Sequence, residues 1–331
     1  MLKLDLDKVV KAVLNKKAKI VAVQIPEGLK QHALDIVEAI ETKANARVFL
    51  LIDPCYGACD LADGEAKRLG AELLLHFGHS PFLKKTEVET VYIPLKYELK
   101  KGSLAILAEK ISKNLEKGTS IGVCTTVQYL GFLEEFKKLL EKKGLKVFVG
   151  QGKGTEKGQI LGCNYSSVKS IEAAVDSIVF LGDGLFHPLG ISFCCNKPVF
   201  TANPLGGEVR EIKGERDLFL RKRFAAIALA QQAERFGILV STKKGQSRKG
   251  LAIELKKKIE AKGKKAFLLA GNLIKSDYLL GMKLDALVST ACPRIAFDDA
   301  SSFKHPVVSP SELLIVFGEK KIDDYNVDKF S

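Results

Sequence analysis

The stretch that decides the fold reads KIVAVQI (19–25), then QHALDIVEAIETKA (31–44), then ARVFLLI (46–52). The first and third pieces are short and continuously apolar, which is typical of strands in a parallel sheet that is covered on both faces. The middle piece places apolar residues at helical spacing. This order of strand, helix and strand predicts a right-handed βαβ unit.

The same unit returns twice along the chain. The second copy reads SIGVCT (120–125), GFLEEFKKLLEKKG (131–144) and KVFVG (146–150), and the third reads FGILVST (236–242), GLAIELKKKIEAKG (250–263) and KAFLLA (265–270). Each copy then continues to a further apolar run: ELLLHF (72–77), SIVFLG (177–182) or ALVST (286–290). The copies begin roughly a hundred residues apart, which indicates repeated domains and not the short period of a solenoid.

We therefore expect an α/β protein of three related small domains, each with a short parallel sheet flanked by helices. The expected domains are 1–100, 101–210 and 211–331. We expect the segment 201–233 to be a loop and a helix that join the second domain to the third.

Composition restricts the class of protein. The chain has 331 residues and a formal net charge of +13, with 46% apolar and 27% charged residues. It has no apolar run near the ~18 residues of a membrane span and no signal peptide at its start, so we expect a cytoplasmic protein without a membrane partner. The positive charge suits an acidic macromolecular partner, or it is only a solvated lysine-rich surface. Basic segments rich in aromatic residues are lacking, so we expect no specific nucleic acid.

The seven cysteines are too few, and odd in number, for a disulfide scaffold. Three of them, Cys59, Cys163 and Cys292, follow predicted strands, one in each domain. Ligands of parallel sheets bind beyond the carboxyl ends of the strands, so these thiols fall where a three-domain assembly would have its centre. The match is imperfect, because Cys292 follows the third run of its copy and the other two follow the second.

Three converging thiolates suit a soft metal centre, and three ligands leave one coordination position open. We expect Cys59 and Cys163 to lie at helix N-termini, where the helix dipole favours an anionic sulfur. The alternative is that the cysteines are inert buried thiols. That interpretation is our expectation for Cys124, which lies inside a predicted strand, and we expect Cys55 to be a buried thiol that lines the site.

Seven short motifs resemble those of diphthamide synthase of the archaeal type, and the resemblance covers essentially the whole chain. In chain order they are IPEGL (25–29), YGACD (56–60), HFGHSPF (76–82), LGCNYSS (161–167), LGDGLFHP (181–188), GQSR (245–248) and STACPR (289–294).

The resemblance implies three domains with pseudo-threefold symmetry around a central 4Fe–4S cluster, held by Cys59, Cys163 and Cys292 with one iron open. It implies transfer of a 3-amino-3-carboxypropyl group from S-adenosylmethionine to C2 of a histidine imidazole in elongation factor 2. The transfer uses a radical and releases 5′-methylthioadenosine. The resemblance further implies a homodimer and an electron donor that reduces the cluster.

Several polar residues in these motifs are candidates for binding S-adenosylmethionine. Arg294, Gln246 and Arg248 can donate hydrogen bonds to its carboxylate. The residues expected near the rest of the cofactor are Asp183, Gly184, Pro26, Glu27, Gly28, His79 and His187. The alternative is that these residues only shape turns, or are hydrogen-bonded structural imidazoles.

Two other functions are compatible with three cysteines. A quinolinate synthase-like enzyme also combines three α/β domains with one 4Fe–4S cluster, and would act on small metabolites with the open iron as Lewis acid. A non-enzymatic binding module would hold a structural zinc instead. The iron content and the products formed from S-adenosylmethionine distinguish the three hypotheses.

Overall fold

The computed structural model describes residues 2–322 and 325, and the chain divides into two compact units. The first unit comprises 1–100 with the short segments 127–131 and 243–245, and the second comprises the remaining residues. Among the described residues, no helix combines the length and the apolar character needed to cross a membrane.

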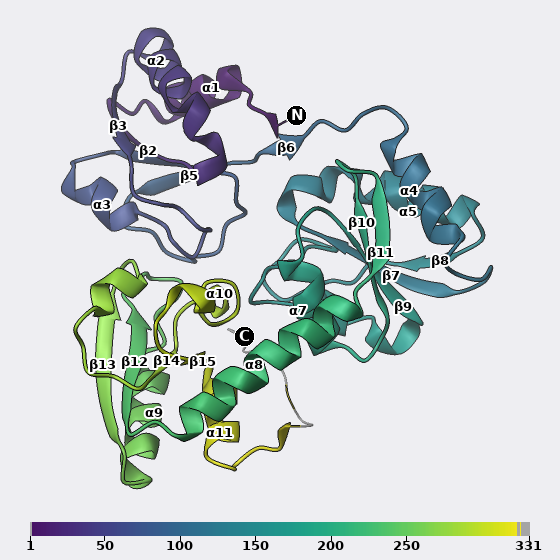
Figure 1. Ribbon diagram of the computed structural model, residues 1–331. Coiled ribbons are helices and arrows are strands. Elements are labelled where there is room, and N and C mark those ends of the chain that lie inside the picture. Colours follow the sequence, from purple (N-terminus) through teal and green to yellow (C-terminus); the bar gives the residue numbers. More distant parts are fainter. Residues whose placement is uncertain (1, 323–324, 326–331) are drawn as a thin grey trace. The chain divides into compact units, whose positions relative to one another are not determined.

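The first unit contains a four-stranded parallel sheet in the order β3-β2-β4-β5, which Figure 1 shows with helices beside it. Its central strand β2 pairs Val21 with Val48 of β3 and with Leu73 of β4. The core gathers the buried side chains of β2 and β4 with those of α1 and α2. The elements are β1 (Leu2–Lys3), α1 (Leu6–Lys16), β2 (Ile20–Gln24), η1 (Glu27–His32), α2 (Ala33–Ala44), β3 (Arg47–Leu51), α3 (Asp63–Arg68), β4 (Leu73–Phe77), β5 (Glu89–Ile93) and β6 (Lys96–Tyr97).

The second unit contains two further sheets. One has the order β11-β10-β9-β7-β8, parallel except for the antiparallel strand β11. Its part of the chain contains α4 (Ser103–Ser112), β7 (Ser120–Thr125), η2 (Val127–Phe132), α5 (Leu133–Lys142), β8 (Lys146–Phe148), α6 (Ser166–Lys169), η3 (Glu172–Ala174), β9 (Ser177–Leu181), α7 (Phe186–Cys194), β10 (Val199–Asn203), β11 (Glu208–Glu211) and α8 (Gly214–Gln231).

The other sheet of this unit is parallel throughout, and Figure 1 shows its strands side by side in the order β13, β12, β14, β15. Buried side chains of α8, α9 and α11 pack with those of the sheet. The elements are β12 (Arg235–Ser241), α9 (Lys249–Ala261), β13 (Lys265–Gly271), η4 (Ser276–Leu279), β14 (Ala286–Ser289), α10 (Pro293–Phe297), η5 (Ala300–Ser302), β15 (Val307–Val308) and α11 (Pro310–Val316).

The expected α/β class with three short parallel sheets flanked by helices is confirmed. Within each sheet the first strand of the repeat lies between the second and the third, so the three sheets share one strand order. The structure adds a fourth strand to each: β5, β10 and β15. The domain boundaries and the pseudo-threefold arrangement stay predictions.

The expectation for 201–233 is wrong in part. The segment contains α8 as expected, but it also contains most of β10 and all of β11, which pair as a hairpin. Strand β11 reads EVRE and is largely exposed, so it lacks the apolar pattern that identifies a strand. The hairpin turn passes through Gly207 at φ 70°, a conformation that favours glycine.

Candidate functional site

Every predicted site residue follows the carboxyl end of a strand in its own sheet. In the first unit, β2 leads to Pro26, Glu27 and Gly28, β3 leads to Cys59, and β4 leads to His79. In the second unit, β8 leads to Cys163, β9 to Asp183, Gly184 and His187, β12 to Gln246 and Arg248, and β14 to Cys292 and Arg294. This is the edge at which parallel α/β sheets bind their ligands.

Solvent exposure separates the seven cysteines into two groups. Cys59, Cys163 and Cys292 are partly exposed, and the other four thiols are buried. Cys124 lies within β7, as expected, and burial raises the pKa of its thiol well above its usual range. Burial also raises the pKa of Cys55 to about 12. An inorganic group from solution requires sulfur atoms that it can reach, and the three predicted ligands satisfy that requirement.

The expected placement of Cys59 and Cys163 at helix N-termini is wrong. Both lie in turns ahead of short helices whose N-caps are Ala62 and Tyr165. Cys292 is itself the N-cap of α10. The effect of the helix dipole falls off within one turn, so it does not explain a reactive thiolate at Cys59 or Cys163.

A buried amide holds the turn that carries Cys59. The Gln24 side chain, at the end of β2, donates from Nε2 to the Asp60 carbonyl at 2.6 Å. Its Oε1 accepts from the Ala62 backbone N–H at 3.1 Å and lies 2.8 Å from His76 Nδ1 on β4. One side chain therefore ties the turn to two neighbouring strands.

The segment 243–245 contributes to the same unit. Lys243 forms a buried ion pair with Asp60; burial raises the pKa of that carboxyl and the bond from Lys243 opposes the rise. The Gly245 N–H donates to the Cys59 carbonyl at 3.1 Å. A Cβ atom on Gly245 would lie 2.4 Å from Cys59 Cα, so a larger residue would displace the turn.

In the second unit, Phe186 joins the Cys163 loop to α10. The Arg294 guanidinium lies 4.8 Å from the centre of the Phe186 ring, and Arg294 Nε donates to Asp298 at 2.7 Å. A Cβ atom on Gly162 would lie 2.0 Å from the Phe186 ring, so only glycine fits there. Gly162 precedes Cys163 by one position and Arg294 follows Cys292 by two. Both therefore pack against the same aromatic side chain, Phe186.

His187 lies beside this contact. Its ring meets Phe186 edge-on at 5.4 Å between centres and stacks on Phe180 at 5.8 Å. Burial lowers the pKa of His187 to about 4, and the charge of Arg294 acts in the same direction. The imidazole is therefore neutral at neutral pH. Asp183 and Gly184, in the loop that leads from β9 to α7, are exposed, and Gly184 has φ 74°.

Arg248 holds the backbone that follows β14 by hydrogen bonds. Its Nε donates to the Thr290 carbonyl at 2.7 Å and its Nη2 to the Ala291 carbonyl at 3.3 Å, directly before Cys292. Gln246, two residues earlier in the chain, is buried at 6% exposure.

The remaining predicted residues lie in the first unit. Pro26 precedes the 3-10 helix η1, Glu27 pairs with Lys30 at 2.8 Å, and Gly28 has open space around its Cα. His79 Nδ1 lies 3.0 Å from His76 Nε2. The contacts of Pro26 and Glu27 are those of a shaped turn.

The sequence predicted no role at the site for four residues that the structure places there: Gln24, His76, Lys243 and Phe186. A signal existed for Gln24, because it is the one polar residue in KIVAVQI after the initial Lys19. None existed for the contact of Lys243 with Asp60, because the partners lie 183 residues apart in the chain.

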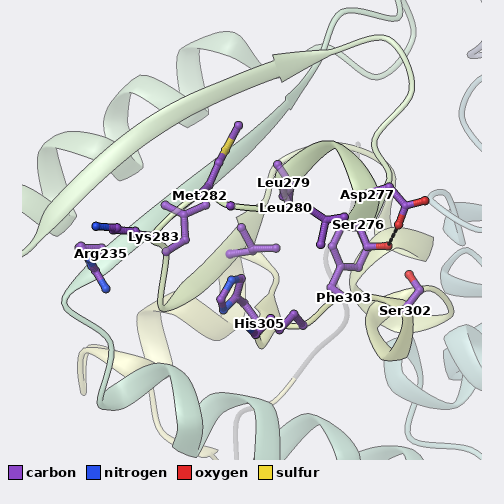
Figure 2. A pocket seen from close by; sticks show the side chains of 14 residues that line it. Arg235, Ser276, Asp277, Leu279, Leu280, Met282, Lys283, Ser302, Phe303 and His305 are labelled. Carbon is purple, nitrogen blue, oxygen red and sulfur yellow. Dashed lines mark hydrogen bonds between the residues drawn. The ribbon is translucent and has the colours of Figure 1, made fainter.

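A cavity of about 490 Å³ lies at the opposite, amino end of the third sheet. Its walls include Arg235 at the start of β12 and Leu284 and His305, which precede β14 and β15. Figure 2 shows the side chains of Leu279, Met282 and Phe303 around it. The predicted site residues are not among those that line this cavity.

Comparisons with known proteins agree on one family. The sequence model of a family described as "Putative diphthamide synthesis protein" matches residues 25–326. The chain is 38% identical to 2-(3-amino-3-carboxypropyl)histidine synthase of Pyrococcus horikoshii, over 94% of this chain and 89% of that protein. It is 30% identical to the protein of that name from Methanocaldococcus jannaschii, over 99% and 94%. The crystal structure of Dph2 from Pyrococcus horikoshii with a 4Fe-4S cluster matches at a TM-score of 0.91 and 36% identity, covering 99% of this chain and 94% of that one.

Proposed function

The chain belongs to the diphthamide synthesis protein family, and from this premise we propose that it catalyses the first step of diphthamide synthesis. It transfers the 3-amino-3-carboxypropyl group of S-adenosylmethionine to C2 of a histidine imidazole in elongation factor 2 and releases 5′-methylthioadenosine. The family resemblance read from the motifs is confirmed. Relatives that match nearly the whole chain carry the name of this transferase.

The observation that carries the proposal is the exposure of the cysteines. The three thiols predicted to bind the cluster are the three that are partly exposed, and each follows the carboxyl end of a strand. Three accessible sulfurs fit a 4Fe–4S cluster that keeps one iron open. Cys59, Cys163 and Cys292 would hold it. When bound, the cluster supplies the electron that reduces the sulfonium of S-adenosylmethionine.

One short segment supports this ligand set. Residues 245–248 form the GQSR motif; Gly245 donates to the carbonyl of Cys59, and Arg248 donates to the two carbonyls that precede Cys292. The same motif therefore orders the backbone at two of the three proposed ligands, each within its own unit.

The polar residues of the second unit bind and orient S-adenosylmethionine in this proposal. Arg294 is 54% exposed and offers its remaining N–H groups to the carboxylate, a charge-assisted bond. Gln246 adds a neutral donor. His187 is neutral, so it places no positive charge beside the cationic sulfonium. Positioning selects which bond to sulfur breaks, because that carbon must lie opposite the incoming electron.

The remaining predicted residues take other places in this proposal. Asp183 and Gly184 are exposed, so we place them beside the adenosine moiety in this proposal. Arg248 acts as a positioning residue, because its guanidinium donates to the Thr290 and Ala291 carbonyls directly before Cys292. Pro26, Glu27 and Gly28 shape the turn after β2. His79 remains a candidate contact.

The partners follow from the same proposal. The protein substrate is elongation factor 2, and the net charge of +13 suits an acidic surface on it. The proposed assembly is a homodimer in the cytoplasm that receives electrons from a separate donor.

The test is product analysis under anaerobic conditions. Purified protein is incubated with a reductant, S-adenosylmethionine and elongation factor 2, and the small molecules are separated by chromatography. We expect 5′-methylthioadenosine and a substrate protein heavier by one 3-amino-3-carboxypropyl group. An iron-containing protein that forms neither product would favour the quinolinate synthase-like alternative, and a protein that contains zinc but no iron would favour the binding module.

A further inference from the structure

A second group of metal-binding side chains lies in the first unit, apart from the three proposed cluster ligands. One ligand atom from each of Cys55, His76 and His79 lies within 4.8 Å of those of the other two. Cys55 and His76 are buried, and His79 is partly buried. The three residues come from the loop after β3, from β4 itself and from the loop after β4.

The hydrogen bonds around His76 place a lone pair on its Nε2, and such a nitrogen can bind a metal. The orientation of the Gln24 amide is fixed, because its Nε2 donates to the Asp60 carbonyl and its Oε1 accepts from the Ala62 N–H. His76 Nδ1 must therefore donate its proton to this Oε1. In the neutral ring, Nε2 then carries a lone pair and accepts a hydrogen bond from His79 Nδ1 at 3.0 Å. A metal ion that binds both nitrogens replaces this bond, and the His79 proton moves to the other nitrogen of its ring.

This arrangement is the one found behind metal-bound histidines. A ligating imidazole commonly donates its other N–H to an oxygen acceptor that fixes the tautomer and the ring orientation. Gln24 provides that acceptor for His76. Two nitrogens at ~2.0–2.1 Å from a tetrahedral zinc ion are about 3.3 Å apart, so the two imidazoles need to move apart by only a few tenths of an ångström. A sulfur at ~2.3 Å from the ion lies about 3.5 Å from each nitrogen, so the Cys55 side chain, whose ligand atom lies within 4.8 Å of the other two, would close in by about 1 Å at most.

From this geometry we propose that Cys55, His76 and His79 bind one zinc ion and leave its fourth position open. One thiolate and two imidazoles are ligands that zinc accepts, and three protein ligands are typical of an open site. The Cys55 thiol loses its proton to solvent when the zinc–sulfur bond forms, and no electron is transferred. The ligand set contains two nitrogens and shares no residue with the three proposed cluster cysteines.

The consequence concerns the turn DPCYGACD (53–60), which carries Cys55 and Cys59. A zinc ion bound to Cys55, His76 and His79 would fasten this turn to β4, beside the bond that Gln24 already makes. The ion would thereby restrict the position of Cys59. This inference deepens the proposed function but does not depend on it, and it assigns His79 to the metal in place of the cofactor.

The experiment measures zinc and iron in the same anaerobically purified holoprotein. The protein is dialysed against zinc sulfate and then freed of excess metal, both metals are counted per chain, and the zinc K-edge X-ray absorption is recorded. We expect about one zinc per chain with one sulfur near ~2.3 Å and two nitrogens near ~2.0–2.1 Å. Iron does not contribute at this edge, so a failure of the cluster proposal leaves the zinc result readable.

Variants assign the ligands. Cys55→Ser and His79→Gln should each weaken zinc binding more than about tenfold, as expected for loss of a direct ligand when loss of a supporting bond alone costs 10–100-fold. Cys124→Ser and His305→Gln are the matched controls, one buried thiol and one imidazole in the second unit, and should retain zinc. Circular dichroism checks that each variant folds. If a variant does not fold, the wild-type absorption spectrum still decides.

Three outcomes would overturn the proposal. Wild-type protein could contain no zinc after dialysis, its zinc could be bound by sulfur alone, or both ligand variants could retain zinc as tightly as the controls. Each would show that the three side chains form only a hydrogen-bonded imidazole pair beside a buried thiol.

Discussion

The two ends of the third sheet, β13-β12-β14-β15, differ in what they offer a ligand. The amino end has a cavity of about 490 Å³, walled by leucines, Met282 and Phe303 with basic side chains among them (Figure 2). The carboxyl end has Cys292, Arg248 and Arg294. A partly exposed thiol and two guanidinium groups lie at the carboxyl end, so the chemistry of the residues favours this end as the candidate site although the cavity lies at the other.

The two ends also differ in how deeply their arginine–carboxylate ion pairs are buried. Near the carboxyl end, Arg223 on α8 is buried at 3% exposure against Glu312 at 0%, and it also donates to the Ala296 carbonyl of α10 and the Val307 carbonyl of β15. At the amino end, Arg235 pairs with Asp285 at 41% and 31% exposure. A buried pair that loses one partner leaves an unpaired charge, whereas an exposed pair is screened by water. The contrast predicts effects of very different size.

The largest effect is expected from the cysteine at the carboxyl end. Cys292→Ala removes one of three proposed cluster ligands, and we expect loss of the iron and a fall in activity of more than about a thousandfold, since catalysis requires the whole constellation. Cys59→Ala and Cys163→Ala should behave alike. Iron analysis and assay of 5′-methylthioadenosine measure both effects.

Two controls accompany these variants. Cys194→Ala removes a buried thiol and should retain iron, and Met282→Ala at the amino-end cavity should retain activity. Full iron content in any of the three ligand variants would contradict the ligand assignment.

The second effect is on stability. Arg223→Met leaves the Glu312 carboxylate buried without its cation, and we expect the free energy of unfolding to fall by about 3–5 kcal/mol. Urea titration followed by circular dichroism measures this. The matched substitution at the other end, Arg235→Met, should cost less than about 1 kcal/mol. Equal losses for the two variants would show that burial does not govern the difference.

The third effect is expected at the exit of β14. Arg248→Met removes the donors to the Thr290 and Ala291 carbonyls, both in fully buried residues, and should cost about 1–3 kcal/mol in the free energy of unfolding. Because Cys292 follows directly, we also expect weaker retention of iron during gel filtration. Arg248→Lys restores one donor and should recover part of both. A variant with unchanged stability and iron would refute the bracing role.

The smallest effect is a pH dependence at the amino end. The bonds from Arg235 lower the pKa of Asp285 from 3.8 to about 2. Between these values the unfolded chain binds more protons than the folded chain, so this contribution is present above about pH 4 and is lost as the pH falls towards 2. Asp285→Asn should therefore differ from wild type by less than about 1 kcal/mol at pH 6.

The measurement for Asp285 compares urea midpoints of the two proteins from pH 6 down to pH 2. The difference between them should shrink as the pH falls towards 2, because Asp285 then becomes protonated in the folded chain as well and its charged bonds to Arg235 weaken. A difference that grows as the pH falls would contradict the sign of the shift.

Much of the fold could be predicted because it depends on local patterns. The runs KIVAVQI and ARVFLLI and the helix between them became β2, β3 and α2, and the same held for both other copies. The sequence pattern did not identify the fourth strands. Strand β15 contains only two residues, and β5 carries charged and polar residues among its apolar ones. The exposed strand β11 was not identified either, because most of its residues are charged.

By itself, the sequence determined the triplicated βαβ units, the strand ends at which the polar motifs lie, and the three cysteines that those motifs contain. Only the tertiary structure decided which of these side chains are supported and by what. The Gln24 side chain donates to the Asp60 carbonyl, and Lys243 pairs with the Asp60 carboxylate although 183 residues of chain separate them. The ligand atoms of Cys55, His76 and His79 lie within 4.8 Å of one another. Periodicity reports which face of an element is buried, because that depends on neighbours along the chain. Contacts between polar groups depend on how strands and loops pack, and no spacing in the sequence records them.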